Sequence, residues 1–182
     1  MDYKEISKLL IEMGLEDQRM RVGFQDPRSA VKFDSKIDRR NTEKLKHIIA
    51  KIGWPTISKV GEEASYAAWL ITQHADHDIY FQEKCLELML QEKDDVLLSN
   101  LAYLTDRAAV NKGKLQVYGT QFYKNRRGNI IPRPIKNPNM LDKRRQQMGL
   151  ESFSKYEQKM KGEYTWKKGY KNPIVGRFYK SL

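Results

Sequence analysis

Residues 62–75, EEASYAAWLITQHA, are apolar on nearly every side of the helix that their spacing predicts. Such a helix is stable only when other elements cover it on all sides, so it belongs at the centre of a packed domain. With 182 residues and 40% hydrophobic content, the chain is long enough to supply that cover within one core. The sequence therefore predicts a mainly α fold built around this segment.

Further amphipathic helices are expected on both sides of the central one. Each has apolar residues at intervals of three and four, and each is bounded by Gly, Pro, Asp or Asn, the residue types that start and stop helices. The predicted helices are 3–22 (ended by Gly23 and Pro27), 38–53 (capped by Asp38 or Asn41 and ended by Gly53), 62–75, one that follows a cap at Asp76 or Asp78, and one that runs from a cap at Asp94 or Asp95 to Gly113.

The pattern changes after the fifth helix. Two extended segments separated by the turn sequence Asn-Arg-Arg-Gly predict a β-hairpin near residues 115–135. Short helices are expected near 140–148 and 151–161. The predicted fold is therefore mainly α, a compact helical bundle of about five helices with a small β-hairpin and C-terminal helices. It forms a single domain over 1–162, and a basic aromatic tail follows at 163–182.

Cysteine content and hydropathy predict a cytoplasmic protein with no membrane partner. Cys85 is the single cysteine, so no disulfide framework is available within the chain. No apolar run approaches the roughly 18 to 20 residues that span a bilayer. The first residues, MDYKEISKLL, have a charged helical pattern and lack the apolar stretch of a signal peptide.

Positive charge is concentrated in the last third of the chain. The net charge is +11, and residues 122–182 hold 16 Lys and Arg against four acidic residues. Aromatic side chains alternate with these cations, an arrangement that suits base stacking and phosphate contact. Residues 122–182 are therefore predicted to bind nucleic acid or an acidic protein, unless they form only a solvated lysine-rich surface.

Three predicted helices each carry one polar residue on an otherwise apolar face. These residues are Asp17, Asn41 and His74. If the apolar faces pack together, the three side chains converge, and a carboxylate on one imidazole nitrogen leaves the other free as a general base. The alternative is structural, with Asn41 as a helix cap and Asp17 in a buried ion pair with Arg21 or Arg107.

A second polar group is expected where the fifth helix meets the hairpin. Asp106 and Arg107 lie on the helix, and Tyr118 and Gln121 lie on the extended segment around Gly119. Their guanidinium, hydroxyl and amide groups can orient a polar ligand, or they can tie the hairpin to the helices. The sequence leaves both interpretations open.

Metal and nucleophile signatures are weak. His47, His77-Asp78 and Asp106 follow the H, HD, D order that resembles the HD phosphohydrolases, a helical family in which these residues bind a divalent metal that activates water. However, His47 is off the apolar stripe of its helix, and no HExxH or CxxC motif occurs. Cys85 lies on an apolar helix face, where a thiol is usually inert. No metal ligand is predicted, and no cofactor is identified.

Several short sequence motifs occur in a fixed order, and together they resemble those of an uncharacterised family of small, mostly bacterial proteins, a domain of unknown function. They are EDQRMR, NTEKLKHIIAKIGWPT, AAWLITQHAD, AYLTDR, YGTQF and DKRRQQMGL, between about residues 10 and 158. The resemblance implies no activity. It does imply that the family signature falls on Asp17, Asn41, Trp54, Pro55, His74, Asp106, Arg107, Tyr118 and Gln121.

The functional prediction combines these observations. We expect an enzyme-like domain, a hydrolase or a transferase, acting on a small polar or phosphorylated substrate. A non-catalytic module that binds nucleic acid or an acidic partner is the main alternative, and an HD-like metal-dependent phosphohydrolase is the other. The predicted catalytic residues are His74, oriented by Asp17 or Asp106, and the predicted substrate-binding residues are Arg107, Tyr118, Gln121, Asn41 and Trp54.

Overall fold

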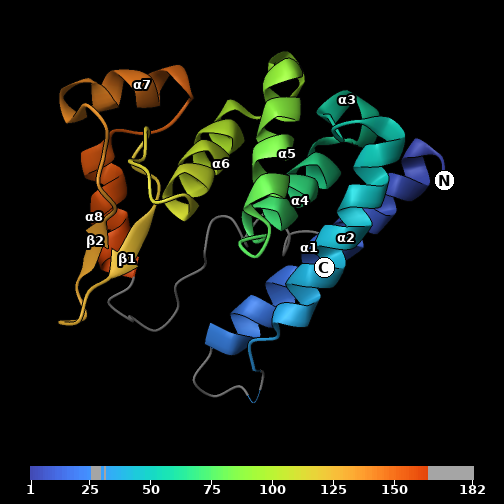
Figure 1. Ribbon diagram of the computed structural model, residues 1–182, viewed down its shortest axis with the longest axis horizontal. Helices are drawn as coiled ribbons and strands as arrows, with labels where there is room; N and C mark the ends of the chain where they lie inside the picture. The colour runs from blue at the N-terminus through green and yellow to red at the C-terminus, as the bar shows by residue number, and fades with distance from the viewer. Residues whose placement is uncertain (26–29, 31, 164–182) are drawn as a thin grey trace. The chain divides into compact units, whose positions relative to one another are not determined.

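The computed structural model describes residues 1–25, 30 and 32–163, and it confirms the mainly α fold (Figure 1). Contacts along the chain group into two compact units, Met1–Asn100 and the part from Leu101 onward. The predicted single domain, 1–162, spans both. The tail predicted at 163–182 lies outside the described residues, apart from Glu163 at the end of the last helix.

The first unit consists of helices packed around α4. They are α1 (Tyr3–Gln25), α2 (Ser35–Ile52), α3 (Ile57–Val60), α4 (Glu62–Gln73) and α5 (Ile79–Gln91), followed by the 3-10 helix Lys93–Asp95. Every residue of α4 from Ala64 to Gln73 is buried, because α1, α2, α3 and α5 all pack against it. The central position predicted for the segment EEASYAAWLITQHA is confirmed.

Helix caps account for most of the differences from prediction. The N-cap of α2 is Asp34, whose side chain accepts from the backbone N–H of Lys36, so the prediction of Asp38 or Asn41 was wrong. Both of those residues are instead buried inside α2. Gly53 ends α2 with a φ of 68°, and Asp78 caps α5, as predicted.

Two further differences concern the segments between helices. The connector before α4 contains the four-residue helix α3, which is too short to give a periodic signal. The predicted caps Asp94 and Asp95 lie in the 3-10 helix, and the Asp95 carboxylate accepts from the backbone N–H of Ser58. Asp95 therefore links two parts of the first unit and does not cap α6.

The second unit surrounds a short β-hairpin. Its helix α6 (Leu98–Asn111) starts at the end of the first unit and is followed by strands β1 (Phe122–Lys124) and β2 (Ile130–Pro132). The strands are antiparallel, with Tyr123 opposite Ile131. After them come the 3-10 helix Pro138–Met140, α7 (Leu141–Gln147) and α8 (Phe153–Glu163), and α8 contacts β2 and α7. The predicted hairpin and C-terminal helices are confirmed.

Gln116 holds the base of the hairpin together. Its buried side-chain amide donates to the carbonyl oxygens of Gln121 and Arg133 at 3.0 and 2.7 Å, and its side-chain oxygen accepts from the N–H of Gln121 at 2.8 Å. One side chain therefore replaces the ladder hydrogen bonds that such short strands lack.

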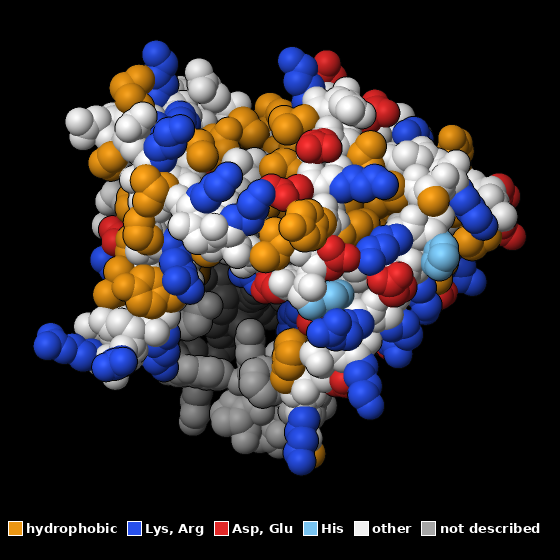
Figure 2. Space-filling model, in the orientation of Figure 1, with side chains coloured by type: hydrophobic (Ala, Val, Ile, Leu, Met, Phe, Trp, Pro, Cys, Tyr) orange, Lys and Arg blue, Asp and Glu red, His pale blue; other side chains and the backbone are white. Residues whose placement is uncertain are grey.

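The described surface is rich in cations. In Figure 2, Lys and Arg side chains are widespread on the face shown, in keeping with the net charge of +11. No helix among the described residues combines the length and the apolar composition needed to cross a membrane.

Candidate functional site

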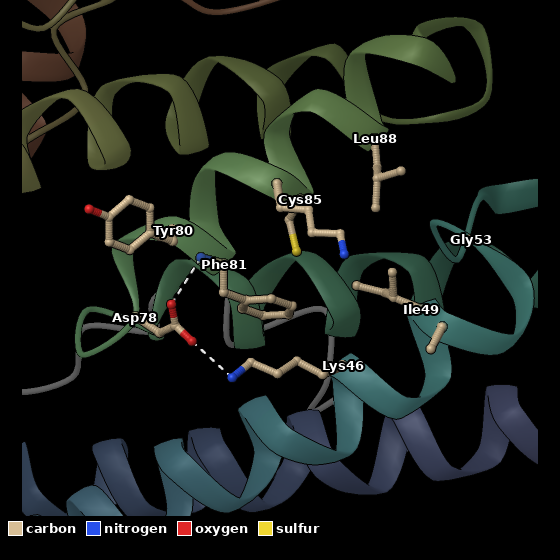
Figure 3. A pocket seen from close by; sticks show the side chains of 10 residues that line it. Lys46, Ile49, Gly53, Asp78, Tyr80, Phe81, Cys85 and Leu88 are labelled. Atoms are coloured by element: carbon tan, nitrogen blue, oxygen red, sulfur yellow. Dashed lines mark hydrogen bonds and ion pairs between the residues drawn. The ribbon is translucent and has the colours of Figure 1, made fainter.

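A hollow of about 470 Å³ lies between α2 and α5 in the first unit (Figure 3). Apolar side chains such as Ile49 and Phe81 line most of it, and Lys46 and Asp78 form an ion pair at 2.9 Å on one side. The Asp78 carboxylate also caps α5 by accepting from the N–H of Phe81. The carboxylate therefore has structural partners on both of its oxygens.

Cys85 is the thiol that lines this hollow. It is fully buried, and burial raises the pKa of its thiol to about 12. Because the thiolate is the reactive form, Cys85 does not serve as a nucleophile near neutral pH. Cys85 therefore gives the hollow no thiolate nucleophile, and neither His74 nor Asp17 lines it.

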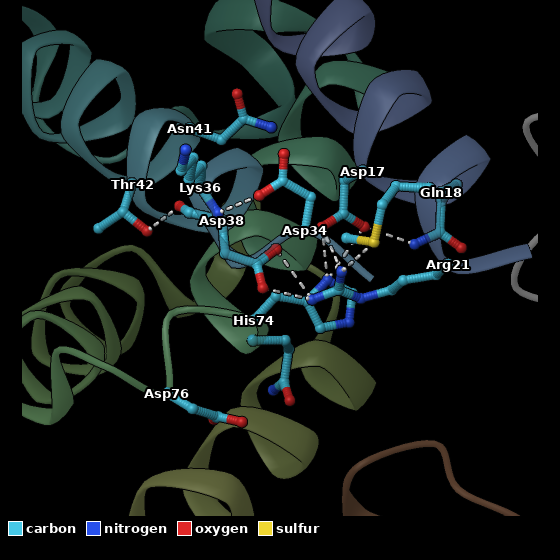
Figure 4. A network of polar contacts seen from close by, with 12 residues as sticks. Asp17, Gln18, Arg21, Asp34, Lys36, Asp38, Asn41, Thr42, His74 and Asp76 are labelled. Atoms are coloured by element: carbon cyan, nitrogen blue, oxygen red, sulfur yellow. Dashed lines mark hydrogen bonds and ion pairs between the residues drawn. The ribbon is translucent and has the colours of Figure 1, made fainter. Parts of the chain in front are cut away.

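His74 lies at the end of α4, where it is the C-cap residue (Figure 4). Its ring nitrogen Nδ1 is 2.9 Å and 3.0 Å from the two carboxylate oxygens of Asp17 on α1. The His74 side chain is 20% exposed, whereas that of Asp17 is 2% exposed. The imidazole thus has one nitrogen against a buried carboxylate, while one fifth of the side chain is exposed.

Asp17 is surrounded by donors. Burial by itself raises its pKa, but the charge and hydrogen bond of His74, the charge of Arg21 and the hydrogen bond from Gln18 outweigh this effect, and the pKa is lowered from its usual value. Gln18 Nε2 donates to Asp17 at 2.7 Å, and Arg21 lies at 3.5 Å. Asp17 is therefore ionised at neutral pH, and as an acceptor it requires the proton of neutral His74 to be on Nδ1.

Arg21 joins the dyad to a second buried carboxylate. Its guanidinium donates to both oxygens of Asp38 on α2, at 3.0 and 3.1 Å. The network Asp38–Arg21–Asp17–His74 consequently ties α1, α2 and α4 together. Asp38 was considered only as a cap, yet it is seven positions before Leu45 on the buried face of α2, a spacing that could have revealed it.

Asn41 and Trp54 are each 1% exposed. Asn41 Nδ2 donates to the carbonyl oxygen of Met13 at 3.4 Å, one turn of α1 before Asp17, and its Oδ1 has no hydrogen-bond partner among the described residues. Trp54 Nε1 is likewise buried without a partner in this part of the chain. Asn41 therefore lies in the same helix interface as the dyad, and Trp54 lies in the core. Their predicted contact with a substrate stays a prediction.

Asp106 has a different environment, in the second unit. Its carboxylate is fully buried and accepts from the backbone N–H groups of Val117, Tyr118 and Thr120 at 2.6, 2.9 and 2.9 Å, and from the Thr120 hydroxyl at 2.9 Å. Four donors thus fix the loop that leads into β1. Of the two carboxylates predicted to orient His74, Asp17 is the one in contact with it, and Asp106 organises this loop.

Arg107, Tyr118 and Gln121 also lie in the second unit. Arg107 donates to the side-chain oxygen of Gln121 at 3.2 Å, and burial together with the nearby charge of Asp106 raises the pKa of Tyr118. The Gln121 amide donates to the Thr120 hydroxyl at 3.1 Å. The helix and the extended segment therefore meet as the sequence suggested. The role of these residues in binding a substrate stays a prediction.

The HD-like arrangement gains no support from the positions of its residues. His47 and His77 are exposed, and Asp78 pairs with Lys46. The Asp106 carboxylate accepts hydrogen bonds from the loop that leads into β1. Within residues 1–25, 30 and 32–163, no three His, Cys, Asp or Glu side chains are grouped so that they could hold a metal ion.

Comparison with protein families identifies one match, which covers residues 7–168. The chain belongs to DUF6624, a family of unknown function. The match includes both polar networks, from Asp17 on α1 to Gln121 before β1. Comparison of this DUF6624 protein with curated proteins and with solved structures found no match. The family therefore supplies no activity, and the function has to be argued from the geometry.

Proposed function

We propose that this DUF6624 protein is an enzyme in which the His74–Asp17 dyad provides general acid–base catalysis for hydrolysis or group transfer. The observation that supports the proposal is the asymmetry of the imidazole. Nδ1 contacts the buried carboxylate at 2.9 Å, whereas Nε2 makes no hydrogen bond to any described residue. The side chain is 20% exposed, and no described residue competes for Nε2.

The chemistry follows from the charge on Asp17. An ionised Asp17 holds the proton of neutral His74 on Nδ1, so the lone pair of Nε2 is free to accept a proton from water or from a substrate hydroxyl. The imidazolium formed in that step is stabilised by the carboxylate. It then returns the proton to the leaving group, so the enzyme ends the cycle unchanged. General acid–base catalysis of this kind contributes about 10²- to 10⁴-fold in rate.

Arg21 and Asp38 act as positioning residues in this proposal. Because Asp38 holds the guanidinium with two hydrogen bonds, Arg21 stays 3.5 Å from Asp17, where its charge adds to the larger effect of His74 in lowering the pKa of that carboxyl. Neither residue is expected to touch the substrate.

The substrate class is a small polar or phosphorylated molecule. In the unit that holds the dyad, Asn41 and Trp54 are the proposed substrate-binding residues. In the second unit, Arg107, Tyr118 and Gln121 offer a cation, a hydroxyl and an amide, the groups that recognise phosphate and polar substituents, and they are proposed to bind a polar ligand there. We propose the bacterial cytoplasm as the setting. The single cysteine, Cys85, is free and buried, which supports this assignment.

The test is a panel of chromogenic esters, phosphomonoesters and phosphodiesters at pH 7–8, assayed with wild type, H74Q, D17N and H77Q. Turnover is expected with wild type and with H77Q, whose exposed histidine is three positions away, and a loss of about 10²- to 10⁴-fold is expected with H74Q and D17N. Thermal melts establish that each variant is folded. Turnover that survives in folded H74Q, or its absence for wild type on every substrate class, would reject the proposal.

A further inference from the structure

The second unit contains a long stretch without negative charge. Between Asp106 and Asp142 there are eight Lys and Arg and no Asp or Glu. The β-hairpin lies in the middle of this stretch, and four of its cations are exposed, namely Lys124, Arg126, Arg127 and Arg133.

The cations of the hairpin are not neutralised by nearby acids. None of these four side chains is ion-paired with a carboxylate among the described residues. On α8 of the same unit, by contrast, Lys159 pairs with Glu151 at 2.7 Å and Lys161 with Glu157 at 2.8 Å. In Figure 2 the hairpin tip, at the lower left as in Figure 1, carries blue side chains with no red one beside them. The hairpin therefore presents a local field that attracts anions.

One face of the hairpin is attached to the unit and the other is open. Phe122 stacks on Phe153 at 6.3 Å and contacts Tyr156 edge-on at 5.7 Å, so its face of β1 packs on α8. Adjacent residues of a strand point to opposite faces. Tyr123 therefore points away from α8, is 38% exposed, and lies under the guanidinium of Arg133 at 4.8 Å. The open face thus carries an aromatic ring already stacked with a planar cation.

The tip between the strands is ordered. The Asn125 side-chain oxygen accepts from the N–H groups of Arg127 and Asn129, both at 2.9 Å, and Gly128 adopts a φ of 83°, which favours glycine. Arg126 and Arg127 are therefore displayed from a turn with a defined backbone, which reduces the conformational entropy lost when an anion binds.

We propose that this hairpin, residues 122–133, binds single-stranded nucleic acid. Arg126, Arg127 and Lys124 contact successive phosphates, and Tyr123, backed by Arg133, stacks with an unpaired base. An acidic protein would satisfy the charge but would leave the open aromatic face unused, since carboxylates offer no ring to stack. The chemistry is common to RNA and DNA single strands. This binding is separate from the His74–Asp17 dyad and does not depend on it.

The first experiment measures fluorescence anisotropy of labelled dT and U dodecamers with the full-length protein, over a salt titration. R126S/R127S is compared with R19S/R39S, a matched control that removes two exposed arginines from α1 and α2. The hairpin variant is expected to bind about tenfold or more weakly and to lose about 1.4 from the slope of log affinity against log salt, because each single-strand phosphate contact contributes about 0.7. The control is expected to match wild type. Equal effects in the two variants, or none in R126S/R127S, would overturn the proposal.

The second experiment tests stacking at Tyr123. Y123L is expected to weaken single-strand binding about fivefold to a hundredfold, and Y123F is expected to retain it, because phenylalanine keeps the aromatic face. A DNA duplex and an octaglutamate peptide serve as competitors and are expected to bind more weakly than the single strands. Duplex or peptide binding that equals the oligonucleotides, or a Y123L variant that binds like wild type, would overturn the proposal.

Discussion

Replacing Asp17 by Asn should destabilise the protein mainly through its charge, because the side chain keeps its shape. Asp17 accepts hydrogen bonds from His74 and Gln18 and lies 3.5 Å from Arg21. All three contacts are strengthened by its negative charge. An amide retains a single acceptor oxygen. Two charge-assisted hydrogen bonds are therefore weakened, each worth about 1.5–3 kcal/mol, while the cost of burying a charge is removed. We expect a net loss of about 3 kcal/mol at pH 7.

The assay is urea unfolding followed by circular dichroism, with thermal melts in parallel. For a chain of this length, about 3 kcal/mol corresponds to a fall of about 6–12 °C in melting temperature. E16Q is the matched control. It changes the neighbouring residue of α1, whose exposed carboxylate pairs with Arg40, and should cost about 0.5 kcal/mol or less.

The pH dependence has a definite sign. The pKa of Asp17 is lower in the folded protein than its usual value of about 3.9, so the stabilisation is complete above that value and is lost as pH falls through the folded pKa. The difference between wild type and D17N should therefore shrink as pH falls below about 4. A loss under about 1 kcal/mol at pH 7, or a difference that does not shrink below pH 4, would refute this reasoning.

Three further predictions follow from the described contacts. G119A should lower the free energy of unfolding by about 2 kcal/mol more than G113A. Both glycines have φ near 68°, but a Cβ at Gly119 would be 2.8 Å from the Phe153 ring, whereas a Cβ at Gly113 meets no atom within 4 Å. Equal urea midpoints for the two variants would contradict this prediction. The Cys85 thiol, with a pKa raised to about 12, should react with a disulfide reagent at pH 8 about a hundredfold more slowly in the native protein than in urea, and rapid native labelling would be the contrary result. D106N should weaken the 117–120 loop by about 2–3 kcal/mol, seen as faster hydrogen exchange at Val117, Tyr118 and Thr120, and unchanged exchange rates would argue against the anchoring role of Asp106.

Helical periodicity was sufficient to predict the longer helices of the fold. The apolar spacing located α4 at the centre of its unit and placed Asp17, Asn41 and His74 on packed faces. Interactions between helices were harder to predict. Asp38 has the residue type and the position of a cap, but the packing of α1 on α2 brings Arg21 to it, and Asp34 caps the helix instead. No local pattern distinguishes these two uses of an aspartate.

The environment of Asp106 could not be predicted for a related reason. Its partners are backbone N–H groups of a loop, which every sequence contains, so the hydrogen bonds depend on the path of the chain around Gly119 and leave no residue signature. The hairpin is the opposite case. Its turn residues were visible in the sequence, but the stacking of Arg133 on Tyr123 required the register of the strands.

The most direct test of the proposed dyad is ¹⁵N NMR of the His74 imidazole in wild type and D17N, at a pH where the ring is neutral. The account predicts that wild type holds the proton on Nδ1, with Nε2 unprotonated, and that D17N shifts the tautomer toward Nε2–H, the form preferred by a free imidazole. A wild-type ring protonated on Nε2, or a tautomer that does not respond to D17N, would contradict the claim that Asp17 prepares His74 to act as a base.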